Sequence, residues 1–210
     1  MKYLVKEIFG PTIQGEGRFT GTPVKFLRLS KCNKWNGRPE SKPTSICNYC
    51  DTDFVGGERM QTPEIITHLE ELYPGLMRVV VTGGEPLLQI QDGKLIDELI
   101  AFGYHVQLET NGSIYTEPRD NLHITVSPKQ FFTETKIYRN CDMKFLYPWI
   151  HPNITPYDFD LSLVNNLYIQ PIAREGEDNT KDAFEEILRL SHAGIEAKLS
   201  LQTHKYAGFE

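Results

Sequence analysis

RVVVTGGEP, at residues 78–86, is the stretch that decides the fold class. Its apolar, β-branched first half is typical of a buried strand, and the glycine pair ends that run. A helical pattern follows over residues 92–102, with apolar side chains at helical spacing and Gly103 as a C-terminal stop. A strand that turns into a helix is part of a βαβ unit, and such units build mostly parallel sheets.

The rest of the chain continues this alternation, but with fewer helices. Further β-rich runs occupy residues 24–29, 105–110, 123–127, 142–146, 167–172 and 196–202. One further helical pattern begins at Thr62, the expected N-cap before Pro63, and another covers residues 180–193. The connections 110–123 and 127–142 are too short or too polar for full helices. We therefore predict an α/β fold, an incomplete TIM-like (β/α) barrel with fewer helices than strands, made by residues 1–210 as one domain.

Polar or glycine-rich motifs follow five predicted strands: TGGEP at 82–86, ETNG at 109–112, SPK at 127–129, QP at 170–171 and QTHK at 202–205. The carboxyl ends of parallel strands meet at one face of a barrel, where ligands bind. Paired glycines also let the backbone approach a ligand closely. Turns are polar in any protein, so each motif alone has an equally good structural explanation; five together favour a binding face.

Composition narrows the class of function. The formal net charge is −6 over 210 residues, and no stripe of Lys or Arg is present, so a small-molecule substrate is favoured over direct nucleic-acid binding. The N-terminal residues lack the apolar core of a signal peptide, and no apolar run reaches the roughly 18–20 residues that cross a membrane. We therefore expect a cytoplasmic protein with reduced cysteines.

Three of the four cysteines, Cys32, Cys47 and Cys50, lie in an irregular loop at about residues 31–60. A long loop in a compact domain is usually functional. A structural zinc site needs four protein ligands, and neither Cys141 nor a histidine offers a recognisable fourth. Three thiolates on a cubane cluster leave one iron without a protein ligand, as a catalytic cluster requires. The spacing favours a cluster, with a structural zinc module as the alternative.

The aromatic Tyr49 before the last cysteine and the Gly-Gly-Glu-Pro motif resemble those of radical S-adenosylmethionine (SAM) enzymes. Their usual spacing is C-x3-C-x2-C, whereas this chain has C-x14-C-x2-C. That longer spacing, together with QGEG at 14–17, CDTD at 50–53, ETNG, SPK and QTHKY at 202–206, resembles the 7-carboxy-7-deazaguanine synthase family over nearly the whole chain. A glycyl-radical-enzyme activase is a second alternative, which normally has the tighter spacing.

The resemblance implies a barrel of the radical SAM type and a lyase activity. The enzyme would convert 6-carboxy-5,6,7,8-tetrahydropterin to 7-carboxy-7-deazaguanine with loss of ammonia, in queuosine or deazapurine biosynthesis. Its cofactors would be a [4Fe–4S] cluster, SAM and Mg²⁺. Its expected partners are a reductant such as a flavodoxin or a ferredoxin, and a second copy of the chain in a homodimer.

The resemblance also implies roles for individual residues. Cys32, Cys47 and Cys50 would bind the cluster, and Thr52 would bind Mg²⁺. The residues implied to contact SAM are Tyr49, Cys50, Asp51, Gly84, Ser127, Pro128, Lys129, Gln170, Pro171, Ile172 and Ala173. Those implied to contact the substrate are Ile13, Gln14, Gly15, Arg28, Thr82 and Glu210. Thr52 between two aspartates could instead cap a turn, and Arg28 could be a surface strand residue.

Overall fold

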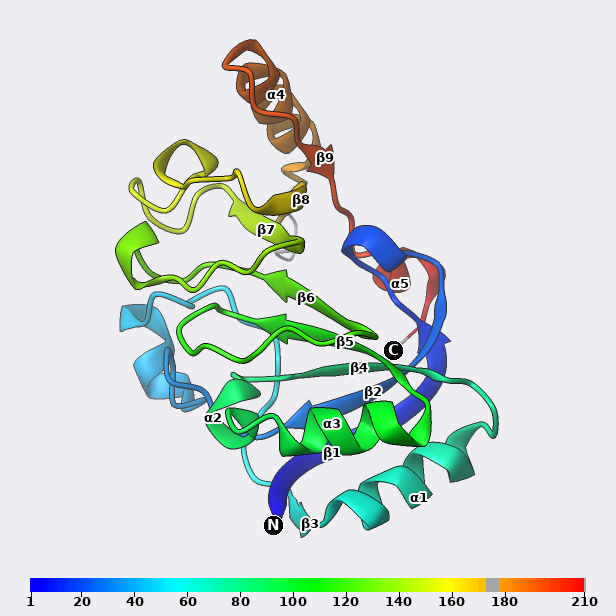
Figure 1. Ribbon diagram of the computed structural model, residues 1–210. Helices are drawn as coiled ribbons and strands as arrows, with labels where there is room; N and C mark the ends of the chain where they lie inside the picture. The colour runs from blue at the N-terminus through cyan, green and yellow to red at the C-terminus, as the bar shows by residue number, and fades with distance from the viewer. Residues whose placement is uncertain (173–177, 210) are drawn as a thin grey trace.

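The structure is a computed structural model that describes residues 1–172 and 178–209 (Figure 1). Its strands are β1 (Tyr3–Ile13), β2 (Pro23–Leu29), β3 (Glu58–Met60), β4 (Arg78–Gly83), β5 (His105–Thr110), β6 (Leu122–Val126), β7 (Cys141–Tyr147), β8 (Val164–Pro171) and β9 (Lys198–Leu199). Its α-helices are α1 (Thr62–Leu72), α2 (Leu87–Ile90), α3 (Lys94–Phe102), α4 (Thr180–His192) and α5 (Thr203–Ala207). Four 3₁₀ helices are η1 (Gly17–Phe19), η2 (Pro39–Thr44), η3 (Phe132–Glu134) and η4 (Pro156–Asp158).

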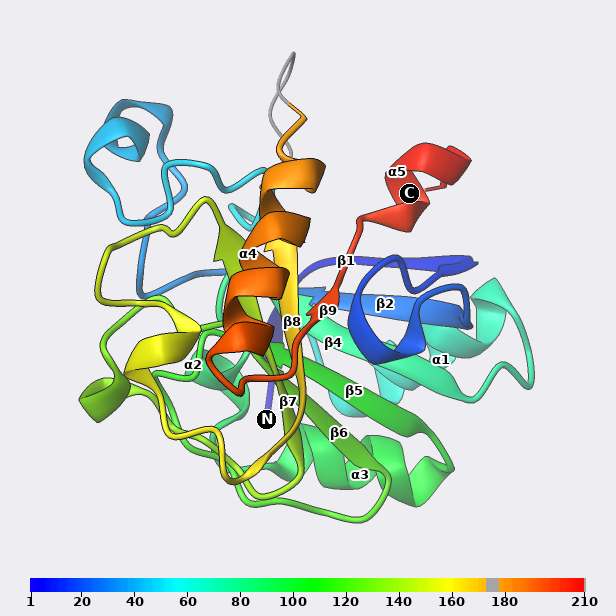
Figure 2. The same ribbon diagram turned by 90° about the horizontal axis from the view of Figure 1, so that it is seen from above.

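One curved, mostly parallel sheet organises the described residues. Its nine strands follow the order β3-β1-β2-β4-β5-β6-β7-β8-β9, so β3 and β9 form two open edges. From β2 to β9 every neighbouring pair is parallel, which gathers the carboxyl ends of seven strands at one edge. Seen from above, the sheet curves without closing (Figure 2). The α/β prediction is confirmed, as is the shortage of helices relative to strands in the described residues.

Two strands were missed by the sequence prediction. β1 runs antiparallel to β2 and to β3, and its alternation of buried and half-buried residues ends after Lys6. The pairing with β2 slips twice, between Val5 and Glu7 and between Phe9 and Thr12. Gly10 and Pro11 lie in the second of these slips, and the two slips together interrupt the regular two-residue period on which a strand prediction rests. β3 has only three residues and occupies the end of the loop expected at about 31–60. β9 is shorter than the predicted run at 196–202.

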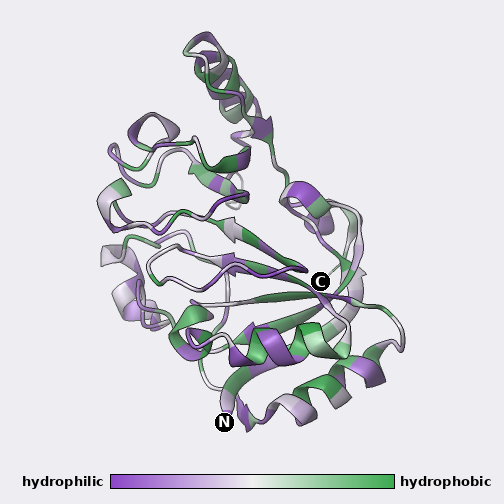
Figure 3. Cartoon of the chain, viewed as in Figure 1, coloured by the Kyte–Doolittle hydropathy of each residue, from purple (hydrophilic) through white to green (hydrophobic). Residues whose placement is uncertain are grey.

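Helices cover the outer face only at the two sides of the sheet (Figure 1). α1 buries Ile65 and Leu69, and α3 buries Leu95 and Leu99; full burial of one such side chain stabilises the fold by about 1.5–3 kcal/mol. Figure 3 shows mostly hydrophobic strands beneath these mixed helices. The connections 110–123 and 127–142 contain no α-helix, as predicted.

The start of α1 differs by one residue from the prediction. Gln61, not Thr62, is the N-cap, and its backbone N–H donates a 2.6 Å hydrogen bond to Glu64 Oε2 in a capping box. Pro63 therefore occupies the second helical position. No helix in the described part of the chain is long and apolar enough to span a bilayer.

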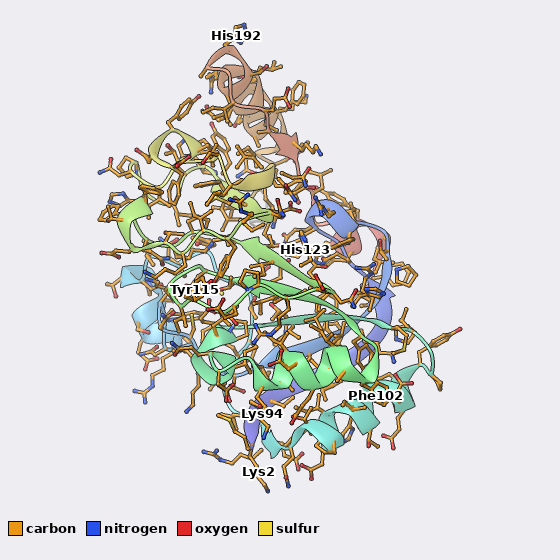
Figure 4. All side chains as sticks on the ribbon, viewed as in Figure 1. Lys2, Lys94, Phe102, Tyr115, His123 and His192 are labelled. Carbon is orange, nitrogen blue, oxygen red and sulfur yellow. The ribbon has the colours of Figure 1, made fainter. Side chains whose placement is uncertain are left out.

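The amino ends of the inner strands are closed by η1. Arg18 Nε lies 3.4 Å from Asp142 Oδ2, and Phe19 packs edge-on against His123, which Figure 4 labels on β6. His123 Nε2 lies 3.1 Å from the same Asp142 oxygen. Although burial alone would raise the pKa of Asp142, hydrogen bonds from His123 and Asn166 hold it below its ordinary value. Ligand access is therefore directed to the opposite, carboxyl edge.

Candidate active site

A cavity of about 520 Å³ opens at the carboxyl edge of the sheet. It is lined by most of the residues that the sequence singled out: Ile13, Gln14, Arg28, Cys32, Cys47, Tyr49, Cys50, Asp51, Thr52, Thr82, Gly84, Ser127, Lys129, Gln170, Pro171 and Ile172. Gly15 and Pro128 are absent from this lining, although each is next to a residue that belongs to it. Ala173 and Glu210 lie outside the described residues.

The three loop cysteines face this cavity as free thiols. A tight turn links the knuckle, since the Cys50 N–H donates a 2.9 Å hydrogen bond to the Cys47 carbonyl. The Tyr49 hydroxyl donates to Cys47 Sγ at 3.8 Å, and the Lys34 N–H donates to Cys32 Sγ at 3.4 Å. Burial raises the pKa of both Cys32 and Cys47. Thiols held neutral in this way would have to release their protons in order to bind a metal.

The three thiols bear on which metal group the cavity could hold. Among residues 1–172 and 178–209, no three His, Cys, Asp or Glu side chains come together closely enough to hold one metal ion. Zinc needs four donors converging on one point. A cubane iron–sulfur cluster places its thiolates on different iron atoms, and three thiols that line one cavity are compatible with such a group.

The glycine pair after β4 allows the backbone to run directly beside the cysteine loop. A Cβ on Gly83, whose φ is +146°, would lie 2.0 Å from the Leu29 carbonyl oxygen. A Cβ on Gly84 would lie 2.3 Å from the Lys31 carbonyl oxygen and 2.7 Å from Cys32 Cβ. Only glycine fits this contact, which brings the Gly84 backbone and Cys32 to the same wall of the cavity.

Glu85, the next residue, is fully buried and fastens two motifs together. Its carboxylate accepts hydrogen bonds from Thr110 Oγ1 (2.8 Å), the Asn111 N–H (2.7 Å) and the Leu87 N–H (3.1 Å). Burial raises its pKa in spite of these donors. Asn111 in turn donates a 3.0 Å hydrogen bond to Asn33 Oδ1, beside Cys32. The Gly-Gly-Glu-Pro and Glu-Thr-Asn-Gly motifs thus support the cysteine loop structurally.

Lys129 supplies positive charge near the thiols. Its ammonium donates hydrogen bonds to Ser127 Oγ at 2.6 Å and to the Ser127 carbonyl at 3.0 Å. Burial lowers its pKa to about 8, while the nearby Cys47 opposes that shift. A lysine fixed at this wall can bind an anionic group of a ligand in the cavity.

A partly buried ionic cluster joins the loop after β1 to the C-terminal segment at the cavity. Lys144 on β7 pairs with Glu16 and lies 3.2 Å from Glu109 Oε2. Glu16 Oε1 accepts hydrogen bonds from Gln170 Nε2 at 2.9 Å and Gln202 Nε2 at 2.7 Å. Burial alone would raise the pKa of Glu16, but Lys144 and the two amides lower it to about 2. The carboxylate therefore stays ionised at neutral pH.

Arg28 is held by a neighbour that the sequence did not reveal. Glu7 on β1 accepts a 2.5 Å hydrogen bond from Arg28 Nε, and the guanidinium carbon lies 5.6 Å from the centroid of the Phe9 ring. Phe9 stacks on Phe26 at 4.8 Å, and both rings line the cavity. The Arg28 contact to Glu7 uses Nε, so the donors on the two terminal nitrogens are not needed for it.

The C-terminal segment covers the loop after β1. The Thr203 N–H donates a 2.9 Å hydrogen bond to the Gly15 carbonyl, and a Cβ on Gly15 would lie 1.7 Å from His204 Nδ1. Lys205 Nζ pairs with Asp51 Oδ2 at 2.6 Å. Burial lowers the pKa of His204, which lines the cavity with Gln202 and Lys205.

Several cavity residues were missed by the sequence prediction. Glu7 and Phe9 were missed because β1 was not recognised. Lys144 offered a usable signal, since a lysine inside the apolar run CDMKFLY at 141–147 must find an ionic partner when buried. Trp35 and Phe54, which pack edge-on at 5.5 Å, belong to an irregular loop where no periodicity shows which side faces the ligand.

The sheet is mostly parallel, and three free thiols and an ionic cluster lie around one cavity at its carboxyl edge. These features are typical of an α/β enzyme. The chain matches no protein-family model. It is 36% identical to the 7-carboxy-7-deazaguanine synthase of Nitratidesulfovibrio vulgaris, over 99% of each chain. It is 38% identical to that of Burkholderia multivorans over 98% of each, and 37% identical to that of Caulobacter vibrioides over 99% of each.

The chain therefore belongs to the 7-carboxy-7-deazaguanine synthase family. Its fold is also similar to the crystal structure of QueE from Escherichia coli, with a TM-score of 0.67, 22% identity and coverage of 95% of this chain and 93% of that one. Because the family is shown, neither alternative from the sequence, the structural zinc module or the glycyl-radical-enzyme activase, is retained.

Proposed function

We propose that this enzyme converts 6-carboxy-5,6,7,8-tetrahydropterin to 7-carboxy-7-deazaguanine with loss of ammonia, as a radical SAM lyase. The family match supports the reaction, and the curved sheet supports a single domain built as an incomplete TIM-like barrel of the radical SAM type. A bound [4Fe–4S] cluster and SAM would supply a 5′-deoxyadenosyl radical that abstracts hydrogen from the substrate.

The observation that carries the proposal is the meeting of three free thiols with the polar strand-end residues in one cavity. Cys32, Cys47 and Cys50 would hold the cluster on the side bordered by Gly84. SAM would lie between Tyr49, the Ser127–Lys129 motif and the end of β8, where Lys129 can pair with its carboxylate.

The pterin would occupy the opposite side of the cavity. Arg28, oriented by Glu7, would pair with its carboxylate, and the stacked Phe9 and Phe26 rings would border its bicyclic ring. The ionised Glu16 would accept hydrogen bonds from the N–H groups of the pterin in addition to its protein donors. These contacts would together determine which carbon of the substrate faces the SAM side.

The proposal includes a magnesium ion at Thr52, which lines the cavity together with its neighbours Asp51 and Asp53. Magnesium keeps several water ligands and binds through few protein oxygens, so one hydroxyl beside a substrate carboxylate is a sufficient anchor. A homodimer, a flavodoxin or ferredoxin reductant and a cytoplasmic location are further parts of the proposal. Free thiols and an iron–sulfur cluster require a reducing compartment.

The test is an anaerobic assay of reconstituted enzyme with SAM, reductant, Mg²⁺ and the carboxytetrahydropterin. We expect 7-carboxy-7-deazaguanine and ammonia in equal amounts, with SAM regenerated. Omission of Mg²⁺ should lower the rate in the wild type, and Thr52→Ala should weaken the dependence on Mg²⁺. Deoxyadenosine formed without a deazapurine would show that the substrate is a different one.

A further inference from the structure

β5, in the middle of the sheet, carries two polar side chains on the face that borders the cavity (Figure 1). In the run HVQLET at 105–110, Val106 and Leu108 belong to the hydrophobic core, and Gln107 and Glu109 occupy the alternate positions. Alternate side chains of a strand point to the same face. Glu109 lines the cavity, whereas Gln107 is 1% exposed and lies outside the lining. Gln107 can therefore affect a ligand only through its neighbours.

The amide of Gln107 is used on one side only. Its Nε2 donates a 2.8 Å hydrogen bond to Glu109 Oε1. Its Oε1 is buried and has no hydrogen-bond partner within residues 1–172 and 178–209. A buried amide oxygen without a partner destabilises the folded state, and an apolar side chain of similar size would not carry that cost. Folding therefore does not account for a glutamine here, and the contact that it does make is to a residue of the cavity.

The Glu109 carboxylate needs a second contact to be fixed in orientation. Its Oε2 lies 3.2 Å from Lys144 Nζ, which is longer than the roughly 2.7–2.9 Å typical of an ammonium–carboxylate hydrogen bond, and Lys144 also pairs with Glu16. The terminal torsion of a glutamate side chain is soft, so this contact alone lets the carboxylate turn. The hydrogen bond from Gln107 to the other oxygen fixes its plane. A carboxylate has about four acceptor sites, so some remain for a ligand.

We propose that Gln107 is a positioning residue for the substrate, which acts by fixing the plane of the Glu109 carboxylate. The inference rests on the proposed function, in which a pterin occupies this side of the cavity. Lys144 holds Glu109 next to Glu16, the carboxylate assigned above to the N–H groups of the pterin. The N–H groups of a planar ring point in fixed directions, so an acceptor whose plane is also fixed binds them best.

Gln130 is a matched control for this role. It is also a buried glutamine whose Oε1 has no partner in the described part of the chain. Its Nε2, however, donates to the Asn111 carbonyl at 3.0 Å and to Thr135 Oγ1 at 3.2 Å. The amide of Gln130 thus joins segments of the chain to one another, whereas the amide of Gln107 holds a side chain of the cavity. The two residues should respond differently to the same substitution.

Stability is the first measurement, by urea unfolding of the reconstituted holoenzyme under anaerobic conditions. Methionine is unbranched, apolar and close to glutamine in size, so it fills the space without the amide. We expect Gln107→Met to unfold at the wild-type urea concentration or a higher one, because a buried unpartnered oxygen is removed. Gln130→Met should unfold at a lower concentration. A loss of stability in Gln107→Met as large as that in Gln130→Met would show a structural role and overturn the proposal.

Substrate binding is the second measurement. The dissociation constant of the carboxytetrahydropterin is determined by anaerobic calorimetry on holoenzyme with SAM and Mg²⁺ but without reductant, so that no turnover occurs. We expect Gln107→Met to weaken this binding about tenfold and to leave the dissociation constant of SAM within about twofold of the wild-type value. Unchanged binding of the pterin would overturn the proposal, as would an equal weakening of SAM.

A double-mutant cycle shows whether Gln107 acts through Glu109. In the Glu109→Gln background, Gln107→Met should weaken binding of the pterin by less than about twofold, because the carboxylate to be positioned is gone. A further tenfold weakening in that background would contradict the assignment. Wild-type enzyme that neither binds nor converts the pterin would refute the proposed function, whereas wild-type and Gln107→Met enzymes that bind it equally would refute only the role of Gln107.

Discussion

The Gln202 side-chain amide donates a 2.7 Å hydrogen bond to the Glu16 carboxylate, across 186 positions of the chain. Glu16 also pairs with Lys144 on β7 and accepts a hydrogen bond from Gln170 on β8. One ionised side chain therefore holds the loop after β1, the far side of the sheet and the C-terminal segment in a common position around the cavity.

Replacing that carboxylate should loosen all three segments. We expect Glu16→Gln to lower the free energy of unfolding by about 1–3 kcal/mol, because Lys144 loses one of its two carboxylate partners while buried. Urea unfolding at pH 7 measures this cost. Glu196→Gln, at an exposed position, is the control and should unfold like the wild type.

The same variant should change the acid response. The pKa of Glu16 is lowered from 4.5 to about 2 in the folded protein, so its stabilisation is present above about pH 4.5 and is lost as pH falls towards 2. The difference in unfolding free energy between wild type and Glu16→Gln should therefore shrink steadily over that window. A difference that stays constant with pH would show that Glu16 acts through shape and not through charge.

The four cysteines should separate into two groups. Cys32→Ala, Cys47→Ala and Cys50→Ala should each abolish the visible iron–sulfur absorption and SAM cleavage. Cys141→Ala should keep both, because Cys141 is 1% exposed in the core at the start of β7 and is absent from the cavity lining. Iron content after anaerobic reconstitution decides the point; iron lost in the Cys141 variant, with its fold intact, would contradict this assignment.

Arg28 should govern substrate affinity. Arg28→Lys removes the forked pair of donors suited to a carboxylate, and we expect the KM for the carboxytetrahydropterin to rise about 10- to 100-fold. Glu7→Gln should raise the same KM less, since it only loosens the orientation of the guanidinium. The dissociation constant of SAM serves as the control for both variants. A change in SAM affinity as large as that in KM would place Arg28 elsewhere in the site.

Gly84 should be intolerant of any side chain. The methyl group of Gly84→Ala would meet the Lys31 carbonyl oxygen at 2.3 Å and Cys32 Cβ at 2.7 Å, so the cysteine loop must shift. We expect a stability loss of about 1–3 kcal/mol and reduced iron loading. Gly56→Ala is the comparison, since nothing lies within 4 Å of its Cβ and only its φ of +79° costs about 1–2 kcal/mol. Full iron loading in Gly84→Ala would refute the steric argument.

The alternation of strands and helices could be predicted from local pattern alone. β4 and α3 follow the apolar periods at 78–86 and 92–102 closely, because burial on one face of each element requires those periods. β1 could not be predicted, since its two-residue period is lost after Lys6 and its antiparallel pairing with β2 depends on the rest of the sheet. The ion pair between Arg18 on η1 and Asp142 on β7, which closes the amino ends of the strands, likewise joins residues far apart in the chain.

The sequence by itself determined the chemistry of this protein: three thiols at a distinctive spacing, glycines where the backbone must pass closely, and polar residues at the ends of strands. Only the tertiary structure decided which charges face each other, namely Arg28 with Glu7 and Lys144 with Glu16 and Glu109. The physical reason is that residue identity fixes what a side chain can bind, whereas pairing between distant segments depends on strand order and register, which arise only when the whole sheet assembles.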